Sequence, residues 1–111
     1  MVKKILYYGV DYGIKPSIEK DDSTYVYTNC FDELKLLVES TKFDCILLDM
    51  DIEKEYVQKR VSYLDLIYPD ILLIAVCGHK SVFSSIKAIT LGLDHAITKP
   101  VDRYELMEYL S

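Results

Sequence analysis

The sequence has no long apolar run and no excess of positive charge. Every apolar stretch is shorter than the roughly 20 residues that span a bilayer, so no transmembrane segment is expected. Asp11 interrupts the apolar N-terminal stretch, which argues against a signal peptide. The net charge is −5, from 13 basic and 18 acidic residues, and nonspecific nucleic-acid binding requires clustered basic residues. We therefore expect no membrane contact and no direct nucleic-acid binding by this domain.

Cysteine is also scarce, and its arrangement excludes the usual zinc sites. The three cysteines, Cys30, Cys45 and Cys77, form no CxxC pair and no His–Cys cluster. Their number is odd, and two of them lie in apolar runs. Reduced thiols and a cytoplasmic location are therefore expected.

Short apolar runs alternate with amphipathic segments along the 111 residues, half of which are hydrophobic. Strands are predicted near residues 3–10, 24–29, 43–49, 71–77 and 94–98. The third and fourth runs are almost continuously apolar, as in central parallel strands covered on both faces. The alternation predicts an α/β fold, a doubly wound five-stranded parallel sheet in a three-layer sandwich. Because no repeat or internal linker occurs, residues 1–111 are expected to form a single domain.

Amphipathic stripes between the strands predict the helices. The stripes cover residues 31–38, 57–68, 82–89 and 102–110. Asn29 is the expected N-cap of the first stripe, and Pro69 ends the second. Gly92 is the expected C-cap of the third, and Asp102 with Glu105 resembles a capping box for the last. The segment before the second strand leaves room for only a short additional helix.

Polar or small residues follow three of the predicted strands. Asp49 ends the third strand, Cys77 and Gly78 end the fourth, and Lys99 with Pro100 ends the fifth. Because the carboxyl ends of parallel strands meet in one crevice, these residues are expected to face one another. A carboxylate opposite a lysine is an arrangement suited to handling phosphate.

This order and spacing resemble the receiver domain of two-component response regulators, which has a flavodoxin-like fold. The resemblance covers the whole chain. It implies that Asp49 accepts a phosphoryl group from a histidine kinase. It also implies phosphate-pairing roles for Lys99, Cys77 and Gly78, of which Gly78 leaves room for the phosphoryl group. Finally, it implies a cis peptide bond between Lys99 and Pro100.

The chain departs from the receiver pattern at several positions. Gly9 and Val10 replace two adjacent acids, and Asp11 is the nearest remaining carboxylate. Cys77 replaces a serine or threonine and is a poorer hydrogen-bond donor. Ala96 replaces the usual switching aromatic residue, and the Pro and Gly that usually follow the acceptor are absent.

The missing acids matter because a carboxylate that attacks a phosphoryl group must approach an anionic reactant. Mg²⁺ normally neutralises that charge, and its loss would cost roughly 10² to 10⁴ in rate. The sequence therefore predicts a pseudo-receiver that is not an enzyme and has weak or no Mg²⁺-dependent phosphorylation. In that reading Asp49 and Lys99 form a structural ion pair. Two alternatives stay open: an atypical receiver that is phosphorylated on Asp49, and a weak metal site made by Asp11, Asp49 and Asp51.

The resemblance also implies partners. A histidine kinase or an output domain is expected to contact the domain, and a homodimer is expected through residues 81–111. Within that range, the helix-four, strand-five and helix-five face comprises parts of 81–92, 94–98 and 102–111. Its expected apolar contact residues are Val82, Phe83, Ile86, Tyr104, Met107 and Tyr109. The chain could then be the N-terminal part of a longer regulator.

Three competing interpretations rest on smaller parts of the pattern. Asp49 and Asp51 resemble the nucleophile and general acid of haloacid-dehalogenase-type phosphatases, and Lys99 resembles their later lysine. That motif normally opens its fold, however, and only 60 residues follow Asp51 here. A flavin-binding flavodoxin would need hydroxyl groups in residues 9–13, where no hydroxyl pair occurs. Lys99 beside Cys77 is expected to favour the thiolate of that cysteine, and a redox role for Cys77 is the third alternative.

Overall fold

A parallel five-stranded sheet forms the middle layer of the computed structural model, which describes residues 2–19, 22–78 and 85–110. The strand order is β2-β1-β3-β4-β5, with all neighbours parallel. The strands are β1 Lys4–Tyr8, β2 Thr24–Thr28, β3 Cys45–Asp49, β4 Leu72–Cys77 and β5 His95–Thr98. The doubly wound sheet and the positions of all five predicted strands are confirmed.

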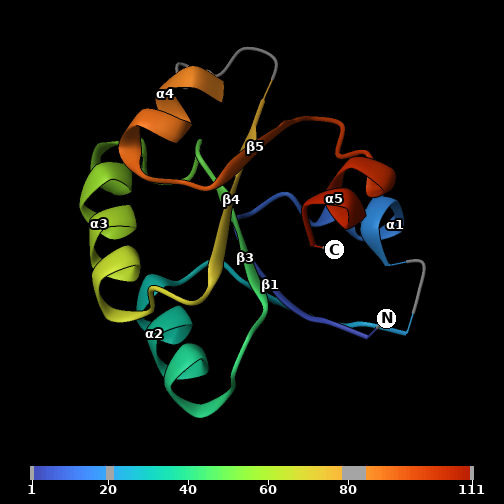
Figure 1. Cartoon of the computed structure of the whole chain (residues 1–111), viewed down its shortest axis with the longest axis horizontal. Helices are drawn as coiled ribbons and strands as arrows, with labels where there is room; N and C mark the ends of the chain where they lie inside the picture. The colour runs from blue at the N-terminus through green and yellow to red at the C-terminus, as the bar shows by residue number, and fades with distance from the viewer. Residues whose placement is uncertain (1, 20–21, 79–84, 111) are drawn as a thin grey trace.

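Helices cover both faces of the sheet. They are α1 Lys15–Ile18, α2 Phe31–Ser40, α3 Val57–Ile67, α4 Ser85–Leu91 and α5 Arg103–Leu110, with 3-10 turns at Tyr12–Ile14 and Lys54–Tyr56. Figure 1 shows α2, α3 and α4 on one face and α1 and α5 on the other. The short first helix is confirmed. The start of the helix predicted at 82–89 lies outside the described residues. None of the described helices is both long and apolar enough to cross a membrane.

Two hydrophobic cores lie on the two faces of the sheet, because successive strand residues point to opposite sides. On β1, Leu6 and Tyr8 join the core beneath α2, α3 and α4, whereas Ile5 and Tyr7 join the core beneath α1 and α5. Every residue of β3 is buried. Full burial of each large apolar side chain contributes about 1.5–3 kcal/mol. Neighbouring Tyr7 and Tyr8 are each 1% exposed, but their side chains lie in different cores, on opposite faces of the sheet.

The N-terminal caps agree only partly with the sequence prediction. The N-cap of α2 is Cys30, in extended conformation, and not Asn29, so that prediction is wrong. The hydroxyl of Thr28, at the end of β2, accepts a hydrogen bond from the Cys30 N–H and sets the entry into the helix. Asp102 does act as a cap, because its Oδ1 accepts the Tyr104 N–H at 2.9 Å.

Gly92 ends α4 as predicted. Its φ is +111°, a conformation that strongly favours glycine. Its N–H donates to the Ile89 carbonyl at 3.0 Å, and the Leu93 N–H donates to the Ala88 carbonyl at 3.2 Å. This pair of bonds is a Schellman motif, which turns the chain directly into β5.

Candidate phosphoacceptor site

Asp49 and Lys99 meet at the carboxyl edge of the sheet, as the strand ends predicted. Asp49 ends β3 and is 2% exposed. The Lys99 Nζ donates to Asp49 Oδ2 at 2.9 Å. The Lys99 N–H donates to the Cys77 carbonyl at 2.8 Å, and the Lys99–Pro100 bond is cis, as predicted. Lys99 thus reaches from the edge strand β5, across the end of β4, to the acceptor carboxylate.

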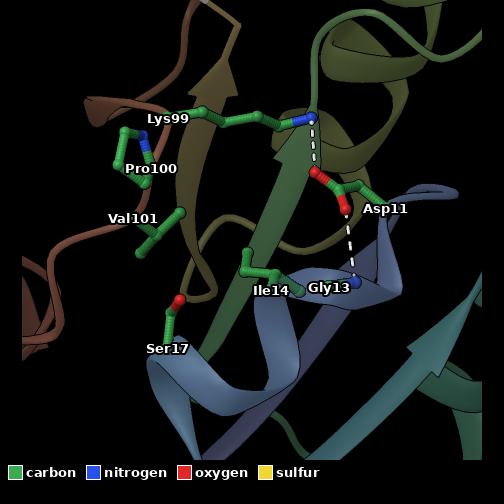
Figure 2. Close-up of a pocket in the computed structure, with 7 residues that line it drawn as sticks. All are labelled: Asp11, Gly13, Ile14, Ser17, Lys99, Pro100 and Val101. Atoms are coloured by element: carbon green, nitrogen blue, oxygen red, sulfur yellow. Dashed lines mark hydrogen bonds and ion pairs between the residues drawn. The ribbon is translucent and has the colours of Figure 1, made fainter.

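Asp11 is the second partner of Lys99. Its Oδ2 lies 3.3 Å from the Lys99 Nζ, and its Oδ1 accepts the Gly13 N–H at 3.2 Å (Figure 2). Burial acts to lower the pKa of Lys99, but the hydrogen bonds and charges of Asp49 and Asp11 outweigh it and raise that pKa. The ammonium therefore stays charged and bridges two carboxylates.

A cavity of about 260 Å³ opens beside this bridge, between the first turns of the chain and the loop before α5 (Figure 2). Its lining residues are Asp11, Gly13, Ile14, Ser17, Lys99, Pro100 and Val101. The acceptor carboxylate of Asp49 does not line this cavity. Lys99 and Asp11 are therefore the charged groups that the cavity presents.

Tyr7 is a site residue that the sequence pattern did not reveal, because a tyrosine inside an apolar strand is expected to pack in the core. Its hydroxyl donates to Asp49 Oδ2 at 3.0 Å and accepts the Asp11 N–H at 3.3 Å. Burial, and then the charge and hydrogen bond of Asp49, raise the pKa of Tyr7 well above its usual range. Tyr7 therefore remains a neutral donor. The available signal was its place on the strand next to β3, near the strand end.

Gly78 and Asp51 lie together on the other side of the acceptor. The Asp51 N–H donates to Asp49 Oδ1 at 2.9 Å, and the Asp51 carboxylate lies over Gly78, 3.0 Å from where a Cβ would stand. Cys77 is 3% exposed. Burial, followed by the charges of Asp51 and Asp49, raises the pKa of Cys77 despite the nearby Lys99. The expectation that Lys99 favours a reactive thiolate here is therefore wrong.

The residues at this edge do not fit Mg²⁺, the ion that the receiver resemblance implies. Mg²⁺ demands near-octahedral oxygen ligands. Lys99 occupies the space between the Asp11 and Asp49 carboxylates, and Tyr7 and the Asp51 N–H donate to the Asp49 oxygens. Within residues 2–19, 22–78 and 85–110, no three His, Cys, Asp or Glu side chains form a group that could hold a metal ion.

A second polar network fixes the loop after Asp49. The Tyr8 hydroxyl donates to Glu53 Oε1 at 3.3 Å, and the Arg60 guanidinium donates to Glu53 Oε2 at 2.9 Å and to the Tyr8 oxygen. Arg60 also lies 4.6 Å from the ring centroid of Phe31, within cation–π range. Glu53 has a φ of +45°, which is uncommon for a residue other than glycine. The network therefore holds this loop in a conformation that its backbone would not favour alone.

We expect Arg60→Ala to return the Glu53 pKa toward its ordinary value. In the native fold, hydrogen bonding to Arg60 is the main cause of a lowered Glu53 pKa, and the Arg60 charge and the Tyr8 hydroxyl add to it. A lowered carboxyl pKa contributes stability above the unfolded pKa of about 4.3, and that stability is lost as the pH falls through the folded value. Carboxyl NMR titration measures the shift, with Lys59→Ala as the control. An unchanged Glu53 titration in Arg60→Ala would contradict the assignment.

Several solved structures with a similar fold are receiver domains of response regulators. The chain superposes on the signal receiver domain of a response regulator from Bacteroides fragilis with a TM-score of 0.84, at 16% identity, over 99% of this chain and 94% of that one. It superposes on the receiver domain of the TMAO respiratory regulator TorR with a TM-score of 0.80, at 20% identity, over 97% of this chain and 92% of that one. It superposes on NtrX from Brucella abortus with a TM-score of 0.82, at 14% identity, over 98% of this chain. The chain spans only 25% of the length of NtrX.

Residues 12–111 match the family model of the response regulator receiver domain, and the chain therefore belongs to that family. No curated protein matches the chain. Membership makes this a signalling domain of the two-component type. It favours the receiver interpretation over the phosphatase and flavin-binding alternatives.

Proposed function

We propose that this receiver domain is a pseudo-receiver, which signals through protein contacts and takes up little or no phosphoryl group on Asp49. One observation carries the proposal. The Lys99 ammonium bridges the Asp49 and Asp11 carboxylates at 2.9 and 3.3 Å, and so an internal cation already neutralises the acceptor. Gly9 and Val10 provide no carboxylate that would bring in a metal beside it.

The charge balance supports the same proposal. Among the residues that the structure describes, the Asp11, Asp49 and Asp51 carboxylates lie at this edge, and Lys99 pairs with the first two. A phosphoryl donor is itself anionic, so these carboxylates would oppose its approach. Without a divalent ion, both the approach and the developing charge lack the stabilisation on which phosphoryl transfer depends.

The expected readout of phosphorylation is also missing. Ala96, at the position of the switching aromatic residue, is a half-buried methyl side chain on β5 and cannot rotate between two positions. On the two helices that contact β5, Ile86 of α4 and Tyr104 of α5 are 80% and 81% exposed. We propose this α4–β5–α5 face as the contact for an output domain, a histidine kinase or a second copy, with an affinity set by sequence alone.

Two of the residues expected on this face are partly buried in the structure. Met107 and Tyr109, which were expected to contribute, pack in part against the core beneath α5. Tyr109 stacks on His95, with ring centroids 4.1 Å apart. Val82 and Phe83, which were expected to join them, lie outside the described residues.

Sedimentation velocity across a concentration series tests the proposal, with and without beryllofluoride and Mg²⁺. We expect one association state that the mimic does not change, whether monomer or dimer, and the same state for Asp49→Asn. A stable dimer would bury about 1,200–2,000 Å² in total. A shift from monomer to dimer that needs the mimic and is lost in Asp49→Asn would contradict the proposal.

The alternative is an atypical receiver phosphorylated on Asp49, and one contact of the Lys99 bridge is common to both functions. The 2.9 Å contact between Lys99 and Asp49 is the pairing that a phospho-accepting receiver also requires. In that case Lys99 would move from the carboxylate to the bound phosphoryl group. Direct detection of the phosphoryl group separates the two functions.

A further inference from the structure

At the end of β1, the Tyr7 ring lies against Gly9. Their side-chain positions lie on the same face of the strand, because they are two residues apart. A Cβ built at Gly9 would stand 2.6 Å from Tyr7 Cζ and 2.8 Å from Asp49 Cβ, and real Cβ atoms essentially never approach other atoms so closely. The tyrosine ring therefore fills the space that any side chain at position 9 would need.

The same ring delivers its hydroxyl to the acceptor. Tyr7 Oη lies 3.0 Å from Asp49 Oδ2, the oxygen that Lys99 also contacts. The remaining oxygen, Oδ1, accepts the Asp51 N–H. Both oxygens of a carboxylate that is 2% exposed are thus already engaged by groups of this chain.

We propose that Tyr7 closes the acceptor site. Its ring excludes an acidic side chain at position 9, and its hydroxyl occupies the Asp49 oxygen that a divalent cation would have to reach. This inference rests on the proposed pseudo-receiver function and names the residue that maintains it. The replacement of two acids by Gly9 and Val10 does not by itself explain weak cation binding, because the Asp11, Asp49 and Asp51 carboxylates are still present at this edge. Removal of Tyr7 should therefore make the site more accessible to a cation.

The hydrogen bond from the Tyr7 hydroxyl to the Asp49 carboxylate competes with a cation for the same oxygen. Such bonds are stronger than neutral ones, and removing one corresponds to roughly tenfold in an equilibrium that competes with it. Lys99 remains in the variant and still competes, so the gain in cation affinity is expected to be limited.

Mn²⁺ titration followed by water-proton relaxation tests the closure in four proteins: wild type, Tyr7→Leu, Tyr7→Phe and Tyr68→Leu. We expect Tyr7→Leu to bind Mn²⁺ about tenfold more tightly than wild type. Adding Asp49→Asn should remove that gain. Tyr68→Leu is the control, because it also replaces a tyrosine that packs partly against a core, but one that follows the end of α3. It should bind as weakly as wild type.

The outcomes separate the two proposals. A folded Tyr7→Leu that binds Mn²⁺ no better than wild type overturns the closure and leaves the pseudo-receiver standing. Wild type that itself binds with sub-millimolar affinity through Asp49 overturns the pseudo-receiver. If Tyr7→Leu does not fold, Tyr7→Phe keeps the ring and removes only the hydroxyl. Because Tyr7→Phe removes the same hydrogen bond to Asp49, we then expect a gain of about tenfold here too, and no gain overturns the closure.

Discussion

Lys99→Met is expected to destabilise the fold by about 3 kcal/mol or more. The substitution leaves the Asp49 carboxylate, which is 2% exposed, without its counter-charge and with the Asp11 carboxylate still nearby. Urea denaturation at neutral pH measures the loss in unfolding free energy. Because the Lys99 pKa is raised in the fold, its stabilising contribution is full below the unfolded pKa of about 10.4 and is lost as the pH rises through the folded value.

Asp49→Asn is the matched control for Lys99→Met, and it should lower the free energy of unfolding much less. The asparagine oxygen can still accept the Tyr7 hydroxyl, and Lys99 keeps its contact with the half-exposed Asp11. We expect this variant to fold almost normally and to keep its partner contacts. The double variant, Asp49→Asn with Lys99→Met, should recover most of the loss from Lys99→Met alone. Equal and additive losses would contradict a buried ion pair.

Gly9→Ala is expected to destabilise the fold by about 1–3 kcal/mol through overpacking. The added methyl group meets the end of the Tyr7 ring at 2.6 Å and Asp49 Cβ at 2.8 Å, and both side chains are held in the core, where they are 1% and 2% exposed. Thermal or urea unfolding measures the loss. In a Tyr7→Leu background the same change should cost less, because one of the two obstructions has been shortened.

Gly78→Ala is the control for Gly9→Ala at the same edge of the sheet. There the nearest atom is the Asp51 carboxylate oxygen, 3.0 Å from the added methyl group, and a side-chain terminus can move aside. A smaller loss than for Gly9→Ala is expected. Similar losses for the two glycines, or a Gly9→Ala loss that is unchanged by Tyr7→Leu, would show that the ring does not fill the space at position 9.

The strands and the central ion pair were predictable because their signals are local or topological. Continuous apolar runs mark β3 and β4, and parallel strands bring their carboxyl ends to one edge, so Asp49 and Lys99 had to approach each other. The end of α4 was predictable for a similar reason, because a glycine after an apolar stripe typically adopts a positive φ.

The rest of the site was not predictable from pattern. Whether Tyr7 packs or donates depends on the direction of its side chain and on which strand lies beside β1, and both require the assembled sheet. Asp11 reaches Lys99 only because the chain turns immediately after β1. The contact of Arg60 with Tyr8 joins residues 52 positions apart, and no local spacing indicates it.

The most direct test of the pseudo-receiver is the intact mass of the protein after incubation with acetyl phosphate and Mg²⁺. A receiver that works as the family resemblance implies, assayed in parallel, shows that the reagent is active. For this chain we expect only the unmodified mass, both in wild type and in Asp49→Asn. A stoichiometric phosphoryl adduct on wild type that is absent from Asp49→Asn would contradict the account and identify Asp49 as a working acceptor.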